Sequence, residues 1–146
     1  MQKISANLVK AKEIMIREEY TLVIVKNEVR TFHERGVKPL LSLLDSSIDL
    51  SLASASDKVV GKAAAMLYVK LGIKELYASV LSKPALEVLT KNGISAEYGE
   101  LVGAIRNRSG DGFCPMESAV INITDIDEAI LAVKAKMAEL SGKIIQ

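Results

Sequence analysis

Residues 56–62 carry the first group of side chains whose types and spacing could bind a ligand. We expect a helix from about Asp57 to Leu71, and the first backbone N–H groups of a helix lack intrahelical partners and attract anions. A glycine inside a helix costs about 1 kcal/mol relative to alanine, so Gly61 indicates the close approach of a ligand or a neighbouring backbone. The segment therefore predicts an anion site, with these ligand-binding candidates: Ser56, Asp57, Lys58, Gly61 and Lys62.

The same residues also have a purely structural interpretation. Asp57 could serve only as the N-cap of the helix. Lys58 and Lys62, one helical turn apart, could form a solvated edge, and Gly61 could only make room for helix packing. Both interpretations stay open at the level of the sequence.

A second group of reactive side chains lies at residues 106–117. Arg106 and Arg108 precede a glycine-rich turn and an expected helix start, which is a combination suited to phosphate. The Gly-Lys-Ser/Thr ending of a P-loop is absent. We therefore take Arg106 and Glu117 as further ligand-binding candidates.

Cys114, the only cysteine of the chain, is the candidate catalytic residue. A thiol at a helix N-terminus near arginines can have a lowered pKa and act as a nucleophile. The alternative is that Cys114 is a buried apolar filler. Cys114 and Glu117 could also ligate a metal, but a third ligand is missing and His33 is expected in a surface hairpin, so we predict no metal site.

Hydrophobic periodicity and turn residues indicate the elements that must position these side chains. We expect an opening helix to about residue 18 behind Ser5, a hairpin at 20–25 and 29–33, a helix at 39–44, a strand at 48–53, the helix at 57–71 ended by Gly72, a strand at 76–81, a helix at 84–91, a strand at 95–98 and a helix at 125–140 capped by Thr124. Strands and helices that alternate after an antiparallel hairpin imply a mixed sheet covered on both faces. We therefore predict a three-layer α-β-α fold of the α/β class, forming a single domain over residues 1–146.

The last helix carries a regular apolar stripe. Its members are spaced by four and three residues: Ile126, Ile130, Val133, Met137, Leu140 and Ile144. Such a stripe usually faces the core of the chain, and the same spacing also permits a seam between subunits. We expect a homo-oligomer.

The overall composition argues against several classes of partner. The net charge of +1 gives no basic surplus for nucleic acid, and two phenylalanines and four tyrosines offer no obvious platform for stacking bases. No apolar run approaches the roughly 20 residues that span a bilayer, and no signal peptide is recognisable. A single cysteine excludes an intrachain disulfide, so we expect a cytoplasmic protein that binds neither nucleic acid nor membrane.

The order helix, hairpin, strand, helix, strand, helix resembles the core of the cytidine deaminase-like superfamily. Two segments are similar to an uncharacterised family within it: Ser-Ala-Ser-Asp-Lys-Val-Val-Gly-Lys-Ala-Ala-Ala at 54–65 and Gly-Phe-Cys-Pro-Met-Glu at 112–117. The resemblance covers most of the chain and implies a cytidine deaminase-like fold. It implies no settled function.

The resemblance also shows what is missing for deaminase chemistry. Deaminases place His-x-Glu or Cys-x-Glu at the start of the first core helix and Pro-Cys-x-x-Cys at the second, which supplies three zinc ligands and a proton shuttle. Here we expect Asp57-Lys58-Val59 at the first position, while Ala85 and Val88 replace the two cysteines. The chain is therefore predicted to hold no zinc or other cofactor and not to be a zinc-dependent deaminase.

Two functions from different classes follow from the sequence. The first is the binding of a nucleotide or related anionic small molecule in a degenerate pocket, through Asp57, Lys62, Arg106 and Cys114. Such a protein could be regulatory, or could catalyse a metal-free transfer with Cys114 as nucleophile. The alternative is a non-catalytic interaction protein that uses the fold as an oligomeric scaffold.

Overall fold

The computed structural model describes residues 5–106, 109–110, 112 and 114–145. Its elements follow in the order α1 (Ala6–Glu18), β1 (Leu22–Val25), β2 (Val29–Phe32), α2 (Lys38–Asp45), β3 (Ser54–Val60), α3 (Lys62–Leu71), β4 (Glu75–Ser82), α4 (Lys83–Lys91), β5 (Ser95–Val102), α5 (Pro115–Val120) and α6 (Ile126–Ile145). The helix, hairpin, strand, helix, strand, helix order that underlies the deaminase-like resemblance is thus confirmed, with α2 inserted after the hairpin.

The described strands form one mixed sheet in the order β2-β1-β3-β4-β5. β1 pairs antiparallel with both β2 and β3, which confirms the predicted hairpin. β4 runs parallel to β3 and to β5. Parallel neighbours need crossover connections, and α3 and α4 supply them.

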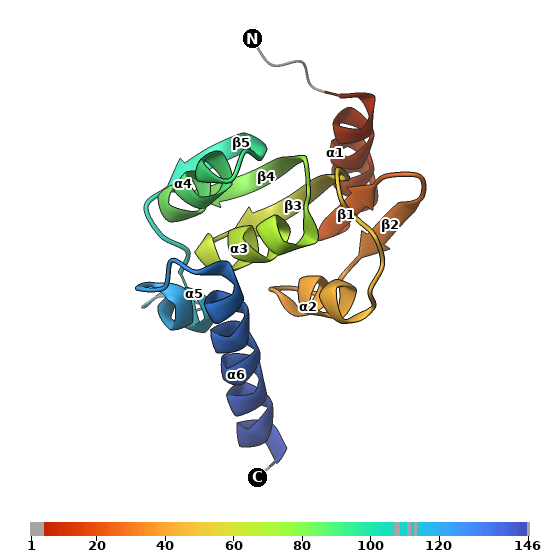
Figure 1. The fold of residues 1–146 in the computed structure, drawn as a ribbon. Helices are drawn as coiled ribbons and strands as arrows, with labels where there is room; N and C mark the ends of the chain where they lie inside the picture. Colours follow the sequence, from red (N-terminus) through yellow and green to blue (C-terminus); the bar gives the residue numbers. More distant parts are fainter. Residues whose placement is uncertain (1–4, 107–108, 111, 113, 146) are drawn as a thin grey trace.

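Helices cover both faces of this sheet (Figure 1). One face carries α1, and the apolar cluster beneath it comprises Leu8, Ala11, Met15, Val23, Val25 and Tyr77. On the other face α3 is central, because α2, α4, α5 and α6 all contact it and its residues 63–68 are buried. The predicted three-layer α/β class is therefore confirmed.

The start of the central helix differs from the prediction. The strand β3 occupies Ser54–Val60, so the strand expected at 48–53 was placed too early and α3 begins at Lys62 instead of about Asp57. Asp57 pairs with Leu22 of β1 and with Ala78 of β4. This strand pairing on both sides outweighs the helical spacing that predicted a helix for this segment. Asp57 is therefore not an N-cap, and Lys58 and Lys62 do not share a helix face.

Glycines mark both ends of α3. Gly61 is its N-cap residue in an extended conformation and offers no side-chain cap, so the expectation of a glycine inside the helix was wrong. Gly72 ends the helix with φ +79°, in the left-handed region that favours glycine. The predicted end of the helix is confirmed.

The N-terminus of α6 is capped one residue later than predicted. The Glu128 N–H donates to Asp125 Oδ2 at 2.8 Å. The short Asp125 side chain thereby satisfies one of the amides that a helix start leaves without an intrahelical partner. Asp125 thus fills the capping role that was expected of Thr124.

The apolar stripe of α6 packs within its own chain. Ile130 and Val133 are buried, and Ile126, Met137 and Leu140 pack against the same core cluster. These five residues therefore serve the core, while the side chain of Ile144 lies outside the described residues. Within the described chain, no helix is both long and apolar enough to cross a membrane.

Candidate functional site

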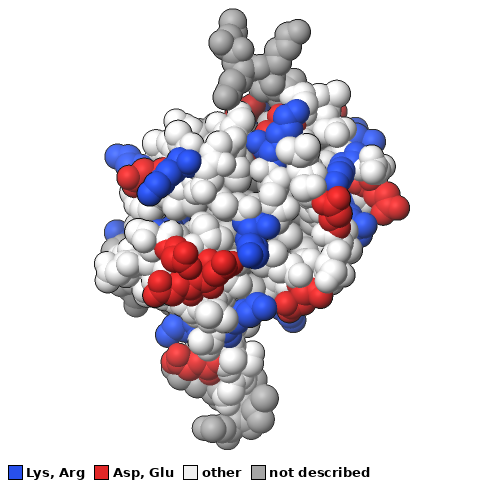
Figure 2. Space-filling model, viewed as in Figure 1, with Lys and Arg blue, Asp and Glu red and all other residues white. Residues whose placement is uncertain are grey.

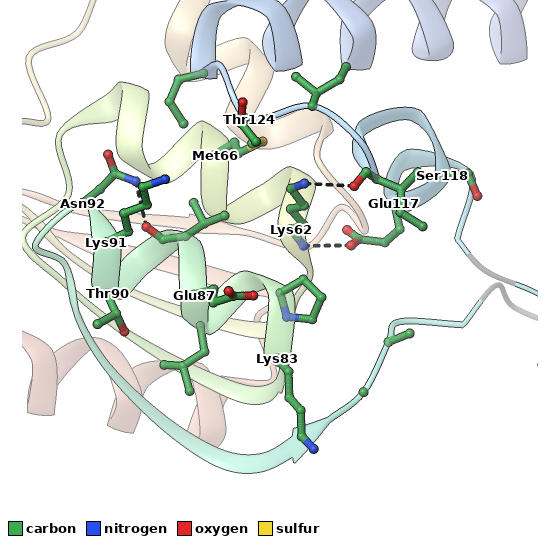
Figure 3. A pocket seen from close by; sticks show the side chains of 18 residues that line it. Lys62, Met66, Lys83, Glu87, Thr90, Lys91, Asn92, Glu117, Ser118 and Thr124 are labelled. Atoms are coloured by element: carbon green, nitrogen blue, oxygen red, sulfur yellow. Dashed lines mark hydrogen bonds between the residues drawn. The ribbon is translucent and has the colours of Figure 1, made fainter.

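A groove of about 980 Å³ lies between α3, α4, α5 and the segments that follow β5 and α5. Its volume is at the upper end of the range of small-molecule sites. The described residues that line it are Lys62, Met66, Lys83, Pro84, Leu86, Glu87, Val88, Thr90, Lys91, Asn92, Gly103, Ala104, Glu117, Ser118, Ile121, Ile123, Thr124 and Ile126. Figure 3 shows Lys62 and Glu117 together on one side of the groove and Lys91 with Asn92 on the opposite side.

The Glu117 carboxylate is bound to the N-terminus of α3. The backbone N–H of Lys62 donates to Glu117 Oε2 at 2.8 Å, and that of Ala63 donates to Glu117 Oε1 at 3.2 Å. Burial raises the pKa of Glu117 above its usual range, and the two N–H donors oppose this rise by stabilising the charged form. The helix start that was predicted to attract an external anion thus already holds an internal carboxylate.

Gly61 makes this contact possible. A Cβ atom at position 61 would overlap the carboxylate group of Glu117. A group does approach Gly61 closely, but it is the side chain of Glu117 and not the ligand or neighbouring backbone that was predicted. Absence of a side chain at Gly61 lets α5 dock against the first turn of α3.

Lys62 ties a second segment to α3. Its Nζ donates to the backbone oxygen of Ile121 at 3.2 Å, just after the end of α5. Together with the Glu117 bonds, this contact fixes α5 and the following turn as one wall of the groove. Gly61, Lys62 and Glu117, selected from two distant parts of the sequence, thus lie in one constellation.

The opposite wall is the outer side of α4. Lys83, Glu87 and Lys91 are four residues apart and therefore share one helix face along the groove. Within the described residues neither Lys83 nor Lys91 forms an ion pair. This wall can therefore offer two ammonium groups to an anion.

Asp57 belongs to a different polar pair. Its carboxylate lies on the α3 side of β3, where Tyr68 Oη donates to Asp57 Oδ2 at 2.6 Å. Burial raises the pKa of Asp57 to about 7, although the hydrogen bond from Tyr68 favours the charged form. Tyr68 is fully buried, and its own pKa is raised by burial and by the neighbouring Asp57. The structure does not bring this pair to the groove.

The other candidates of this segment are also separated from the groove. Ser56 is fully buried, and its Oγ donates to the sulfur of Met15 at 3.3 Å beneath α1. Lys58 is exposed on β3. The strand alternates its side chains between the two faces of the sheet, so Ser56 and Asp57 cannot act in one pocket.

Arg106 and Cys114 flank the second candidate segment. Arg106 is exposed after β5, and residues 107, 108, 111 and 113 lie outside the described residues. Cys114 is the N-cap residue of α5, and its N–H donates to the Ile105 oxygen at 3.1 Å. Its partly buried side chain packs against the core cluster, and neither residue is among the described lining of the groove.

The first turns of α3 and α4 carry no His, Cys, Asp or Glu side chain. The first core helix begins with Lys62-Ala63-Ala64, and not with residues 57–59 as expected, while Ala85 is buried in the first turn of α4. Within the described part of the chain, no three His, Cys, Asp or Glu residues gather as a metal site would require. Whether the purified protein holds zinc stays a prediction for metal analysis.

Sequence reasoning missed most of the groove. Its apolar lining comes from α4 and from the turn between α5 and α6, where Leu86, Ile121 and Ile123 look like ordinary core residues. The available signal was the Lys-Glu-Lys spacing at 83, 87 and 91, which places three charges on one face of a short helix.

The chain is similar to proteins of one known family. A family model described as TM1506, domain of unknown function (DUF1893), matches residues 10–137. The crystal structure of a DUF1893 family protein (TM1506) from Thermotoga maritima is 29% identical, with a TM-score of 0.83 over 92% of this chain and 93% of that chain. Among proteins with curated descriptions, none matches.

A second solved structure overlaps only in part. It is a diaminohydroxyphosphoribosylaminopyrimidine deaminase/5-amino-6-(5-phosphoribosylamino)uracil reductase from Thermotoga maritima. It is 16% identical, with a TM-score of 0.42 over 63% of this chain and 35% of that chain.

Proposed function

The chain belongs to the DUF1893 family, and we propose that it binds an anionic small molecule in the groove between α4 and α5. The observation that carries this proposal is the groove itself, which combines aliphatic side chains with the ammonium groups of Lys83 and Lys91, and neither lysine forms an ion pair with a described residue. A largely apolar cavity with a few polar groups at its rim is typical of ligand sites. Nucleotides remain one class of candidate ligand.

The charge distribution supports a small ligand in preference to a nucleic acid. On the face shown in Figure 2, basic and acidic side chains lie in small groups of both signs, with broad uncharged areas between them. Extended phosphate backbones need a continuous basic surface. A single anionic group needs only a local excess of positive charge, which the α4 wall provides.

The hydrogen bonds of the Glu117 carboxylate also support the proposal, because they affect the charge that the groove presents. Because its carboxylate takes two N–H donors of α3, its charge is partly offset within the chain. The groove therefore presents Lys62, Lys83 and Lys91 against one uncompensated carboxylate, that of Glu87. Metal-free transfer chemistry at Cys114 would require the thiol to reach this groove, so we assign the protein a binding role.

A thermal-shift screen tests the proposal. Nucleotides, sugar phosphates and carboxylic acids are added to the wild-type protein, because a ligand at 100 times its Kd stabilises by about 2.7 kcal/mol. The groove variant is Ile121→Glu, which adds a negative charge at a side chain that is 59% exposed. Its matched control is Leu131→Glu, since Leu131 is 69% exposed and does not line the groove.

An anionic hit should lose its thermal shift in Ile121→Glu and keep it in Leu131→Glu. The proposal is wrong if no anionic compound stabilises the wild type. It is also wrong if both variants respond to the hit as the wild type does.

A further inference from the structure

The described lining of the groove includes a set of aliphatic side chains between its charged groups. Its apolar residues are Met66, Pro84, Leu86, Val88, Ala104, Ile121, Ile123 and Ile126. None of the described lining residues is aromatic. Aliphatic walls favour an alkyl chain by removing it from water, whereas a nucleobase is usually held by stacking on an aromatic ring or an arginine.

Charged groups lie at both sides of the groove, and Glu87 of α4 lies between them (Figure 3). On one side, the ammonium group of Lys62 and the carboxylate of Glu117 are engaged with Ile121 and with α3. On the other side Lys91 is exposed and forms no ion pair with any described residue. The neighbouring Asn92 amide already donates to the Val88 oxygen at 2.8 Å. Lys91 therefore offers the cation that an incoming anion can pair with.

We propose that the groove selects a free aliphatic carboxylate over a nucleotide, an inference that rests on the proposed function. The alkyl chain lies against the aliphatic residues of α4 and of the turn between α5 and α6. The carboxylate pairs with Lys91 near the end of α4. The Glu117 side of the groove receives the apolar end of the chain.

Isothermal titration calorimetry on the wild-type chain tests this selection. The probes are hexanoate, octanoate and decanoate below their micelle concentrations, with octylamine and adenosine monophosphate for comparison. Affinity should rise with chain length by up to about fourfold per buried methylene group. Octylamine should bind more weakly than octanoate, because its cation meets lysines.

Substitutions locate the carboxylate. Lys91→Gln should weaken decanoate binding about threefold at low salt, as expected for an exposed ion pair. Lys74→Gln is the matched control, because Lys74 is an exposed lysine that does not line the groove. Ile121→Glu should abolish decanoate binding, and Leu131→Glu should not change it.

The outcomes separate this inference from the proposed function. Binding of adenosine monophosphate without decanoate overturns the aliphatic selection and leaves the proposed function intact. Absence of binding by every anion overturns both. Equal affinity for octanoate and octylamine overturns the carboxylate assignment. A further outcome is that the protein co-sediments with phosphatidylglycerol vesicles and that decanoate does not reduce this co-sedimentation. That outcome overturns the assignment of a free acid.

Discussion

Two carboxylates reach the central helix α3 in different ways. Asp57 comes from the adjacent strand β3 and meets the phenol of Tyr68 in the middle of the helix. Glu117 comes from α5, 55 residues beyond Lys62, and meets backbone N–H groups at the start of the helix. Burial raises the pKa of both groups.

The difference lies in what each carboxylate receives in exchange for water. Glu117 gains two backbone donors and the positive end of the helix dipole, which offset part of the cost of burying its charge. Asp57 has a side-chain donor in Tyr68 and backbone donors in Val59, at 3.4 Å, and Lys58, and burial still raises its pKa to about 7. Glu117 therefore acts as a structural anchor for the groove wall, whereas Asp57 is a partly buried acid that titrates near neutral pH.

The largest expected effect is the titration of Asp57. Its pKa is 3.8 in a reference state and about 7 in the folded chain, so the folded chain binds this proton more tightly than the unfolded chain. The contribution to the free energy of unfolding is full below about pH 4 and falls as the pH rises to about 7, by roughly 4 kcal/mol at most. Urea denaturation across this range should show that Asp57→Asn removes most of the fall.

The control for this titration is an exposed acid. Asp127 pairs with Lys70 at 2.8 Å on the surface, and Asp127→Asn should leave the pH dependence nearly unchanged. If Asp57→Asn retained the slope of the wild type, the acid that holds its proton would have to be another group.

The second effect breaks the Glu117 anchor without altering a charge. In Gly61→Ala the new Cβ would occupy the place of the Glu117 carboxylate, which must then leave the N–H groups of Lys62 and Ala63. Hydrogen bonds to charged groups contribute about 1.5–3 kcal/mol, so we expect a loss of about 3 kcal/mol in the free energy of unfolding. Hydrogen exchange of the Lys62 and Ala63 amides should accelerate.

Gly142→Ala is the matched glycine control. A Cβ at Gly142 would meet no atom within 4 Å, and alanine is favoured in a helix. This variant should be at least as stable as the wild type. Equal stability of Gly61→Ala and Gly142→Ala would contradict the anchor.

Most of the fold could be predicted because its signals are local. Apolar spacing defines α1 and α6, and Gly72 ends α3. The start of α3 could not be placed, since Asp57 and Lys58 fit a helix equally well on local grounds. Their strand conformation depends on pairing with β1 and β4, which are distant in the sequence.

The candidate site was predictable only in pieces. Residue type and spacing selected Gly61, Lys62 and Glu117 as separate candidates, but their contact depends on how α5 docks on α3. The apolar lining of the groove gave no signal, because the sequence does not distinguish a core residue from a ligand-site residue at a side chain such as Ile123. Asp57 was selected for the wrong reason, as a helix cap instead of a buried acid.

A smaller effect is expected from Glu117→Gln, which measures how much of the stabilisation by the Glu117 anchor depends on its charge. Glu117→Gln keeps an acceptor oxygen but loses the charge and one acceptor, so we expect a loss of about 1–2 kcal/mol. A double-mutant cycle sharpens this measurement, because Gly61→Ala should cost much less when Glu117→Ala has removed the overlapping carboxylate. Additive losses in urea denaturation would show that the two residues act independently.

The smallest effect concerns the hydroxyl of Tyr68. Tyr68→Phe leaves the buried ring in place and removes the donor to Asp57, which should lower the free energy of unfolding by about 1 kcal/mol. Because this hydrogen bond favours the charged carboxylate, its loss should raise the pKa of Asp57 further. The fall in stability should then extend to higher pH than in the wild type, while Tyr98→Phe, at a residue that is 41% exposed, should not move it. If the fall in the free energy of unfolding moved to lower pH in Tyr68→Phe, the phenol would have to stabilise the protonated acid. The contrast between Asp57 and Glu117 would then depend on burial alone.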